Sequence, residues 1–124
     1  MILAPDQRLY VADRSSDRIQ VFEKNGQFVR EALLAPRTLG NGSVWDLAIS
    51  PDPEGRWLFV ADGQNMKVWI LDRQSLQVMG EFGRGGRQAG QFDWVHNIAI
   101  DAEGSLYTAE VNNGRRIQKF SLQE

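Results

Sequence analysis

Leu-Tyr-Val-Ala-Asp at residues 9–13 opens a pattern that returns as Leu-Phe-Val-Ala-Asp at 58–62 and Leu-Tyr-Thr-Ala-Glu at 106–110. The three copies begin 49 and 48 residues apart. Similarity at a fixed period of this length indicates a repeat architecture such as a solenoid, a propeller or an array. The first copy begins too close to Met1 for a complete repeat to precede it, so we expect the chain to be part of a larger object.

A second apolar run follows each copy after a polar loop, at residues 18–22, 67–71 and 116–120. These runs are short, rich in β-branched and aromatic residues, and bounded by Asp, Asn, Gly and Ser. Such runs are typical of strands. No stretch carries the i, i+3, i+4, i+7 apolar pattern of an amphipathic helix. The repeat therefore contains at least two consecutive strands.

Two further elements complete the repeat. Residues 44–49 align position by position with residues 95–100, just ahead of the second and third copies of the phrase. A turn closed by glycine joins each of them to the phrase, which favours a tight hairpin. A fourth strand is predicted at residues 27–30 and again at 77–82. The repeat is thus a unit of four antiparallel strands.

Four antiparallel strands in each repeat form the blade of a β-propeller. We expect an all-β, partial propeller of about ten strands, or about two and a half blades. The first blade spans residues 6–35 without an inner strand, the second 44–83, and the third 95–124 without an outer strand. Missing blades or self-association must close the ring, because unclosed blades expose apolar faces and unpaired edges.

The composition excludes several classes of function. The 14 Lys and Arg against 16 Asp and Glu give no general attraction to nucleic acid or to an anionic membrane. The absence of cysteine excludes disulfides, cysteine zinc sites and thiol nucleophiles. Residues 1–5 are apolar but do not form a signal peptide, and no apolar run approaches the ~20 residues of a membrane span. We therefore predict no nucleic-acid partner and no membrane span.

The phrase and the run that follows it resemble the NHL repeat. Residues 9–13 and 18–29 follow the NHL pattern almost residue for residue. From Leu9 to Phe120, the repeats are similar to the C-terminal half of six-bladed propellers in the peptidyl-α-hydroxyglycine amidating-lyase-like group, particularly its bacterial members. The resemblance implies an NHL-type, six-bladed propeller. Relatives of this kind are often exported, so it also favours a periplasmic or secreted protein.

The resemblance implies a zinc ion on the propeller axis, held by three histidines, with an arginine nearby. His96 falls at the position of the last zinc-ligand histidine, and Arg14 at that of the active-site arginine. Asn97 stands where the animal lyases carry Asp, and Trp94 where they carry Met. Because His96 is the one histidine of this sequence, the other ligands of a three-histidine site have to come from elsewhere.

We therefore predict His96 as a metal ligand and Arg14 as a catalytic residue that holds a substrate carboxylate, which guanidinium geometry suits. Trp45, Trp94 and Asn97 are predicted to contact the ligand near the channel mouth. Plainer interpretations stay open. Trp45 occupies the position aligned with His96, so this position accepts an aromatic residue without a metal role. Arg14 can equally be an exposed loop arginine, although the other repeats hold no arginine there.

Asp13, Asp62 and Glu110 end the three copies of the phrase. Because a carboxylate recurs in every repeat, we interpret these residues as structural groups and not as a ring of cation ligands. An Asp at a strand end commonly accepts hydrogen bonds from the following loop. A Lys or Arg also follows each carboxylate closely enough in sequence to pair with it.

Two functions remain open from the sequence. The first is binding of a small molecule or peptide at the axial mouth, and its sharpest form is amidating-lyase-like chemistry with zinc. The second is a non-catalytic propeller that binds protein or glycan through its loops and edges. The sequence alone does not decide whether the protein is an enzyme.

Overall fold

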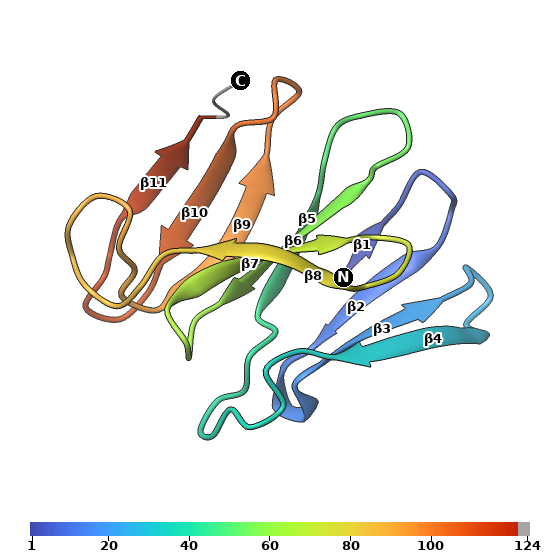
Figure 1. Ribbon diagram of the computed structural model, residues 1–124, viewed down its shortest axis with the longest axis horizontal. Helices are drawn as coiled ribbons and strands as arrows, with labels where there is room; N and C mark the ends of the chain where they lie inside the picture. The colour runs from blue at the N-terminus through green and yellow to red at the C-terminus, as the bar shows by residue number, and fades with distance from the viewer. Residues whose placement is uncertain (122–124) are drawn as a thin grey trace.

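A computed structural model describes residues 1–121, which fold into three antiparallel sheets that fan out from one another (Figure 1). Within this described range there are eleven strands, one short 3-10 helix at Arg14–Ser16 and no α-helix. The predicted all-β, partial propeller is confirmed, and each sheet is one blade. No helix in the described range is long and apolar enough to cross a membrane.

The first blade contains four strands in the order β1-β2-β3-β4. They are β1 (Ile2–Leu3), β2 (Leu9–Asp13), β3 (Arg18–Phe22) and β4 (Phe28–Leu33). The prediction that this blade lacks an inner strand is wrong, because Ile2 pairs with Tyr10 and Leu3 with Leu9. The turn that follows makes this pairing possible: the Gln7 amide donates to the Ala4 carbonyl at 2.9 Å and folds the apolar N-terminal residues back onto β2.

The second and third blades repeat the same order of strands. The second consists of β5 (Asp46–Ile49), β6 (Trp57–Asp62), β7 (Lys67–Asp72) and β8 (Val78–Phe82). The third consists of β9 (Val95–Ile100), β10 (Leu106–Glu110) and β11 (Ile117–Phe120). Residues 122–124, which the sequence assigns to the third blade, lie outside the described range. The inner strands β5 and β9 lie next to each other, since the Ile98 amide donates to Asp46 at 2.9 Å.

Two hydrophobic clusters fill the spaces between the blades. Successive side chains of a strand point to opposite faces of its sheet, so the phrase of the middle blade contributes to both clusters. In the second blade, Leu58 and Val60 pack toward the first blade in the cluster that contains Tyr10. Phe59 packs against the other cluster, which contains Ile98 and Leu106 of the third blade. The strongly alternating phrase therefore joins three blades into one stack.

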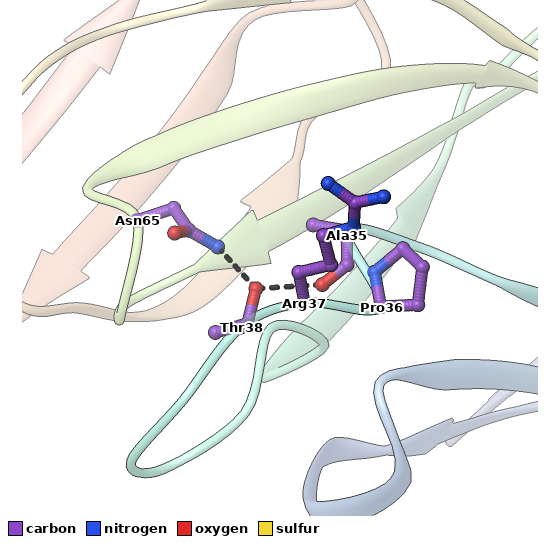
Figure 2. Close-up of a pocket in the computed structure, with 5 residues that line it drawn as sticks. All are labelled: Ala35, Pro36, Arg37, Thr38 and Asn65. Atoms are coloured by element: carbon purple, nitrogen blue, oxygen red, sulfur yellow. Dashed lines mark hydrogen bonds between the residues drawn. The ribbon is translucent and has the colours of Figure 1, made fainter.

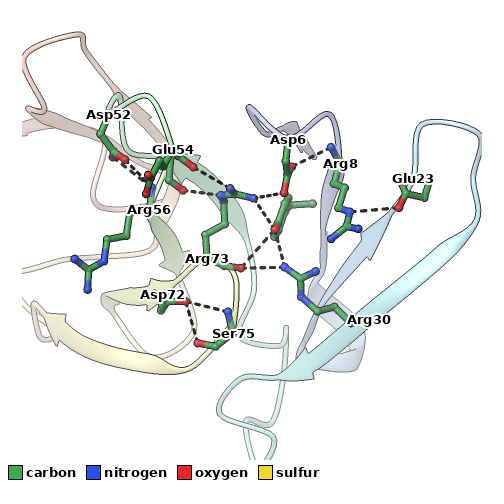
Figure 3. A network of polar contacts seen from close by, with 12 residues as sticks. Asp6, Arg8, Glu23, Arg30, Asp52, Glu54, Arg56, Asp72, Arg73 and Ser75 are labelled. Carbon is green, nitrogen blue, oxygen red and sulfur yellow. Dashed lines mark hydrogen bonds and ion pairs between the residues drawn. The ribbon is translucent and has the colours of Figure 1, made fainter.

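A buried arginine links the first two blades (Figure 3). Arg73 is 1% exposed, and its guanidinium donates to the Gly55 carbonyl at 2.5 Å and the Glu54 carbonyl at 2.9 Å. It also donates to the Tyr10 hydroxyl at 2.8 Å and to the Asp6 carboxylate at 2.9 Å, both in the first blade. Burial acts to raise the pKa of Asp6, but the bonds from Arg73 and the Arg8 amide outweigh it, so that pKa lies below its usual value.

We expect Arg73→Met to lower the free energy of unfolding by about 3 kcal/mol, because it leaves the buried Gly55 carbonyl, the Glu54 carbonyl and the Asp6 carboxylate without their donor. Urea unfolding followed by fluorescence measures the change. Arg56→Met is the matched control, since Arg56 is exposed and an exposed substitution changes stability by less than about 0.5 kcal/mol. Equal stability of the two variants would contradict a linking role for Arg73.

Candidate functional site

The links between blades and the turns after β2, β6 and β10 all lie at one end of the sheets. The register requires this, because Asp13 pairs with Arg18, Asp62 with Lys67, and Glu110 with Val95 at the start of β9. We call this the mouth end, and it comprises the segments 14–17, 34–45, 63–66, 83–94 and 111–116. Arg14, Trp45 and Trp94 lie in these segments. The other two predicted site residues, His96 and Asn97, lie at the start of β9 beside them.

Trp45 is the centre of a group of side chains at the mouth end, which we call the mouth cluster: Arg14, Trp45, Trp94 and His96. The Trp45 ring centroid lies 5.9 Å from that of Trp94 and 5.6 Å from that of His96, whose plane is perpendicular to it. The guanidinium carbon of Arg14 lies 4.7 Å from the same centroid. The structure therefore brings together four predicted site residues from all three blades.

Two glycines allow this close packing. A Cβ atom at Gly42 would lie 1.8 Å from the Arg14 carbonyl oxygen, and the φ of Gly42 is +81°. A Cβ atom at Gly63 would lie 2.8 Å from the Trp45 ring and 2.7 Å from the Val95 carbonyl oxygen. Gly63 is the repeat position that matches Arg14. The matched position thus carries glycine where Trp45 and the Val95 carbonyl leave no room for a Cβ atom, and arginine where the side chain lies over Trp45.

Trp94 adopts a left-handed backbone conformation with φ of 60°. Its amide faces the Met66 sulfur at 3.1 Å, and its carbonyl accepts the Val111 amide at 3.0 Å. A left-handed conformation costs a residue with a bulky side chain about 1–2 kcal/mol. Such strain persists where the surrounding structure fixes it, and it concentrates at functional sites. The same bonds hold the Trp94 indole beside Trp45.

Asn97 and Asp46 orient the imidazole of His96. The His96 Nδ1 atom lies 2.8 Å from the Asn97 Oδ1 atom, while the Asn97 Nδ2 atom faces the Asp46 carboxylate at 3.4 Å. Because the Asn97 amide group directs its nitrogen to Asp46, its oxygen accepts from Nδ1 of His96. A neutral His96 then presents the lone pair of Nε2, which can accept a hydrogen bond or ligate a metal. Asn97 itself is exposed.

Sequence reasoning did not find Asp46. The signal was nevertheless present, because residues 44–49 align with 95–100, so that Asp46 corresponds to Asn97 and Trp45 to His96. Equivalent positions on neighbouring inner strands lie side by side around the axis, and both pairs are in contact. The alignment of these two repeats therefore predicts two contacts of the site, Trp45 with His96 and Asp46 with Asn97.

The recurring carboxylates at the ends of β2, β6 and β10 are structural, as predicted, but one of the expected pairs does not form. Asp13 pairs with Arg18 at 2.7 Å, and the last carboxylate of the series pairs with Arg116 at 2.6 Å. Asp62 instead accepts from the Trp69 indole at 2.8 Å and the Asn65 side chain at 2.7 Å. Burial raises the pKa of Asp62, and these bonds offset only part of that effect.

We expect Trp94→Gly to change the free energy of unfolding by less than about 1 kcal/mol, because relief of the left-handed strain offsets the lost ring contacts. Trp45→Gly is the matched control, since Trp45 has no positive φ and loses its packing without compensation. We expect that control to cost about 2 kcal/mol or more. Urea unfolding measures both, and equal losses would show that the Trp94 backbone is not strained.

Comparison with known proteins identifies the fold. No protein-family model matches the chain. Among solved structures, the chain is similar to Kuenenia stuttgartiensis hydrazine synthase, with 21% identity and a TM-score of 0.66 over 87% of this chain and 27% of the other. A streptogramin B lyase is 18% identical, with a TM-score of 0.61 over 98% and 39%.

A catalytically inactive virginiamycin B lyase from Staphylococcus aureus, solved with quinupristin, is 11% identical, with a TM-score of 0.65 over 98% of this chain and 40% of the other. All three are propeller-type proteins. The chain spans between about a quarter and two fifths of their length. At these identities the likeness shows the fold, and the described residues form adjacent blades of a β-propeller.

Proposed function

We propose that the protein is an NHL-type, six-bladed propeller that binds a carboxylate-bearing small molecule or peptide at its mouth end. At a coarser level, the comparisons support a propeller that acts as a binding or interaction domain. The observation that carries the finer proposal is the mouth cluster. It combines a cation, two indoles and an oriented imidazole within contact distance of Trp45.

Arg14 is free to bind an anion. Among the described residues, no carboxylate lies within 4.0 Å of its guanidinium group. The guanidinium lies over the Trp45 ring, a cation–π contact that reduces the freedom lost when it binds an anion. A carboxylate can accept two parallel hydrogen bonds from this group. Trp45 and Trp94 supply apolar surface, and the Nε2 atom of His96 supplies an acceptor for a ligand N–H or O–H group.

We expect an acetylated Phe-Phe dipeptide with a free carboxyl terminus to bind about tenfold more tightly than its amidated counterpart, as measured by tryptophan fluorescence. Arg14→Gln should abolish the preference for the free acid. The preference should survive Arg56→Gln, which removes a matched arginine whose guanidinium carbon lies 4.5 Å from the Trp57 ring at the other end of the blades. Equal binding of acid and amide by the unaltered chain would refute the role of Arg14.

The sharpest form of the proposal is amidating-lyase-like activity, with His96 as one zinc ligand. Its Nε2 atom suits that role, because Asn97 fixes the other ring nitrogen. A catalytic zinc site, however, needs three protein ligands. The described residues contain no group of three His, Cys, Asp or Glu side chains that could hold a metal. These residues do not complete a zinc site, so we derive no chemical step through the metal.

If the zinc form of the proposal holds, a complete propeller that supplies the other zinc ligands purifies with stoichiometric zinc. The His96→Ala variant of that propeller should then purify without it. Metal analysis of the purified proteins measures this. Asn97→Ala is the matched variant, since it keeps the ligand and removes only its orientation, and we expect a loss of about tenfold or more in affinity. Unchanged zinc content in His96→Ala would overturn the lyase form and leave ligand binding at the mouth cluster unaffected.

A further inference from the structure

The loops at the two ends of the blades carry opposite charge. The mouth-end segments hold six arginines against Asp17 and Asp93, a formal charge of +4. The loops at the other end, residues 4–8, 23–27, 50–56, 73–77 and 101–105, hold six carboxylates against four cations, a formal charge of −2. The chain as a whole has a net charge of −2. The strand residues that border the mouth-end segments add four carboxylates and two cations, so the mouth end with these residues has a formal charge of +2. They are Asp13, Arg18, Asp46, Asp62, Lys67 and Glu110. The mouth end is therefore the more positive end of a chain whose net charge is negative.

Five of the six mouth-end arginines have no carboxylate partner. All five are exposed, and none has a carboxylate within 4.0 Å among the described residues. We call them the rim arginines: Arg14, Arg37, Arg84, Arg87 and Arg115. The sixth, Arg116, pairs with Glu110 at 2.6 Å and donates to the Arg87 carbonyl at 2.5 Å, which ties the third blade to the link before it. Among the described residues, one mouth-end arginine therefore forms an ion pair within the fold, and the five rim arginines can bind the carboxylates of a ligand.

One rim arginine borders a hollow of about 350 Å³ (Figure 2). Ala35, Pro36, Arg37, Thr38 and Asn65 line it. The Thr38 hydroxyl donates to the Ala35 carbonyl at 2.7 Å and accepts from the Asn65 side chain at 2.9 Å, so the polar groups of the wall satisfy one another. The hollow is open to solvent, and Arg37 places a cation at its edge.

We infer that the mouth end binds an acidic peptide, whose side-chain carboxylates pair with the rim arginines while an apolar residue contacts Trp45 and Trp94. This inference rests on the proposed function and specifies its ligand class. An arginine that donates two hydrogen bonds to one carboxylate gives selectivity for an acidic ligand. An excess of positive charge also accelerates the encounter with a negatively charged partner. The negative loops at the other end repel the same peptide and so favour one orientation.

A peptide fits this surface better than a single-stranded nucleic acid does. Nucleic-acid grooves follow a continuous backbone and offer successive aromatic platforms. Here the five rim arginines lie on four loops, with Arg84 and Arg87 on the same one, and the indoles of the mouth cluster form a single pair. The rim arginines on their loops suit a peptide whose carboxylates are spaced along its chain. The single pair of indoles, Trp45 and Trp94, suits one apolar side chain of that peptide.

The test compares three probes on the unaltered chain: the peptide Glu-Glu-Phe-Glu-Glu, the same peptide with Gln for Glu, and an oligouridine of five nucleotides. Tryptophan fluorescence titration at low and high salt gives the affinities. We expect the Glu peptide to bind most tightly and to weaken with salt. A triple variant, Arg84→Gln, Arg87→Gln and Arg115→Gln, should lose about tenfold in affinity at low salt. Lys24→Gln with Arg56→Gln removes two cations from the other end as a control and should bind like the unaltered chain.

The outcomes separate this inference from the proposed function. If the Glu and Gln peptides bind equally and Trp94→Gly weakens both, the rim inference is overturned and binding at the mouth cluster stands. If oligouridine binds most tightly, the peptide assignment is overturned. If no peptide binds and the free-acid dipeptide also fails, the proposed function is overturned with it. Circular dichroism of the triple variant checks that it keeps the β-structure of the unaltered chain.

Discussion

The alternation of side chains along the strands governs this structure, because it gives every blade two apolar faces that need cover. Tyr10 and Phe59, at the same position of successive phrases, each pack toward the following blade, while Leu58 packs toward the preceding one. At the last described blade the same rule leaves Ile117 75% exposed. One apolar side chain removed from water is worth about 2 kcal/mol, so the stacking of blades supplies most of the drive to fold. The hydrogen bonds of Arg73 to Asp6 and Tyr10 then fix the position of the first blade relative to the second.

The same stacking builds the candidate site. The inner strands β5 and β9 begin side by side, so two contacts at the mouth end join equivalent positions of two repeats. Trp45 meets His96, and Asp46 faces Asn97. A repeat protein creates a site of mixed chemistry when one position carries different side chains in successive blades. The scaffold keeps the spacing constant, while substitution at matched positions supplies an indole, an imidazole, a carboxylate and an amide.

The fold was predictable from the sequence because the phrase, its period and its β-branched residues all point to the same unit. The mouth cluster was predictable as well, since the irregular positions Arg14 and His96 stand out against the repeat. Three features were not. The two-residue strand at Ile2–Leu3 is too short to show a period. Asp62 bonds to Trp69 instead of Lys67, because burial of the carboxylate selects the nearest indole donor. Arg73 looks like an ordinary turn residue until the first blade covers it.

The placement of cations separates those that hold the fold from those that are left for a ligand. Arg18, Lys67 and Arg116 pair with carboxylates of their own blades, and Arg73 pairs between blades. These four satisfy the needs of folding. The rim arginines add five positive charges to one end, where the same segments hold only Asp17 and Asp93, and no described carboxylate lies within 4.0 Å of a rim arginine. The apolar clusters involve none of these side chains, so the packing of the blades does not account for their presence. If the mouth end binds an acidic peptide, these charges serve recognition of the ligand and not the folding of the propeller.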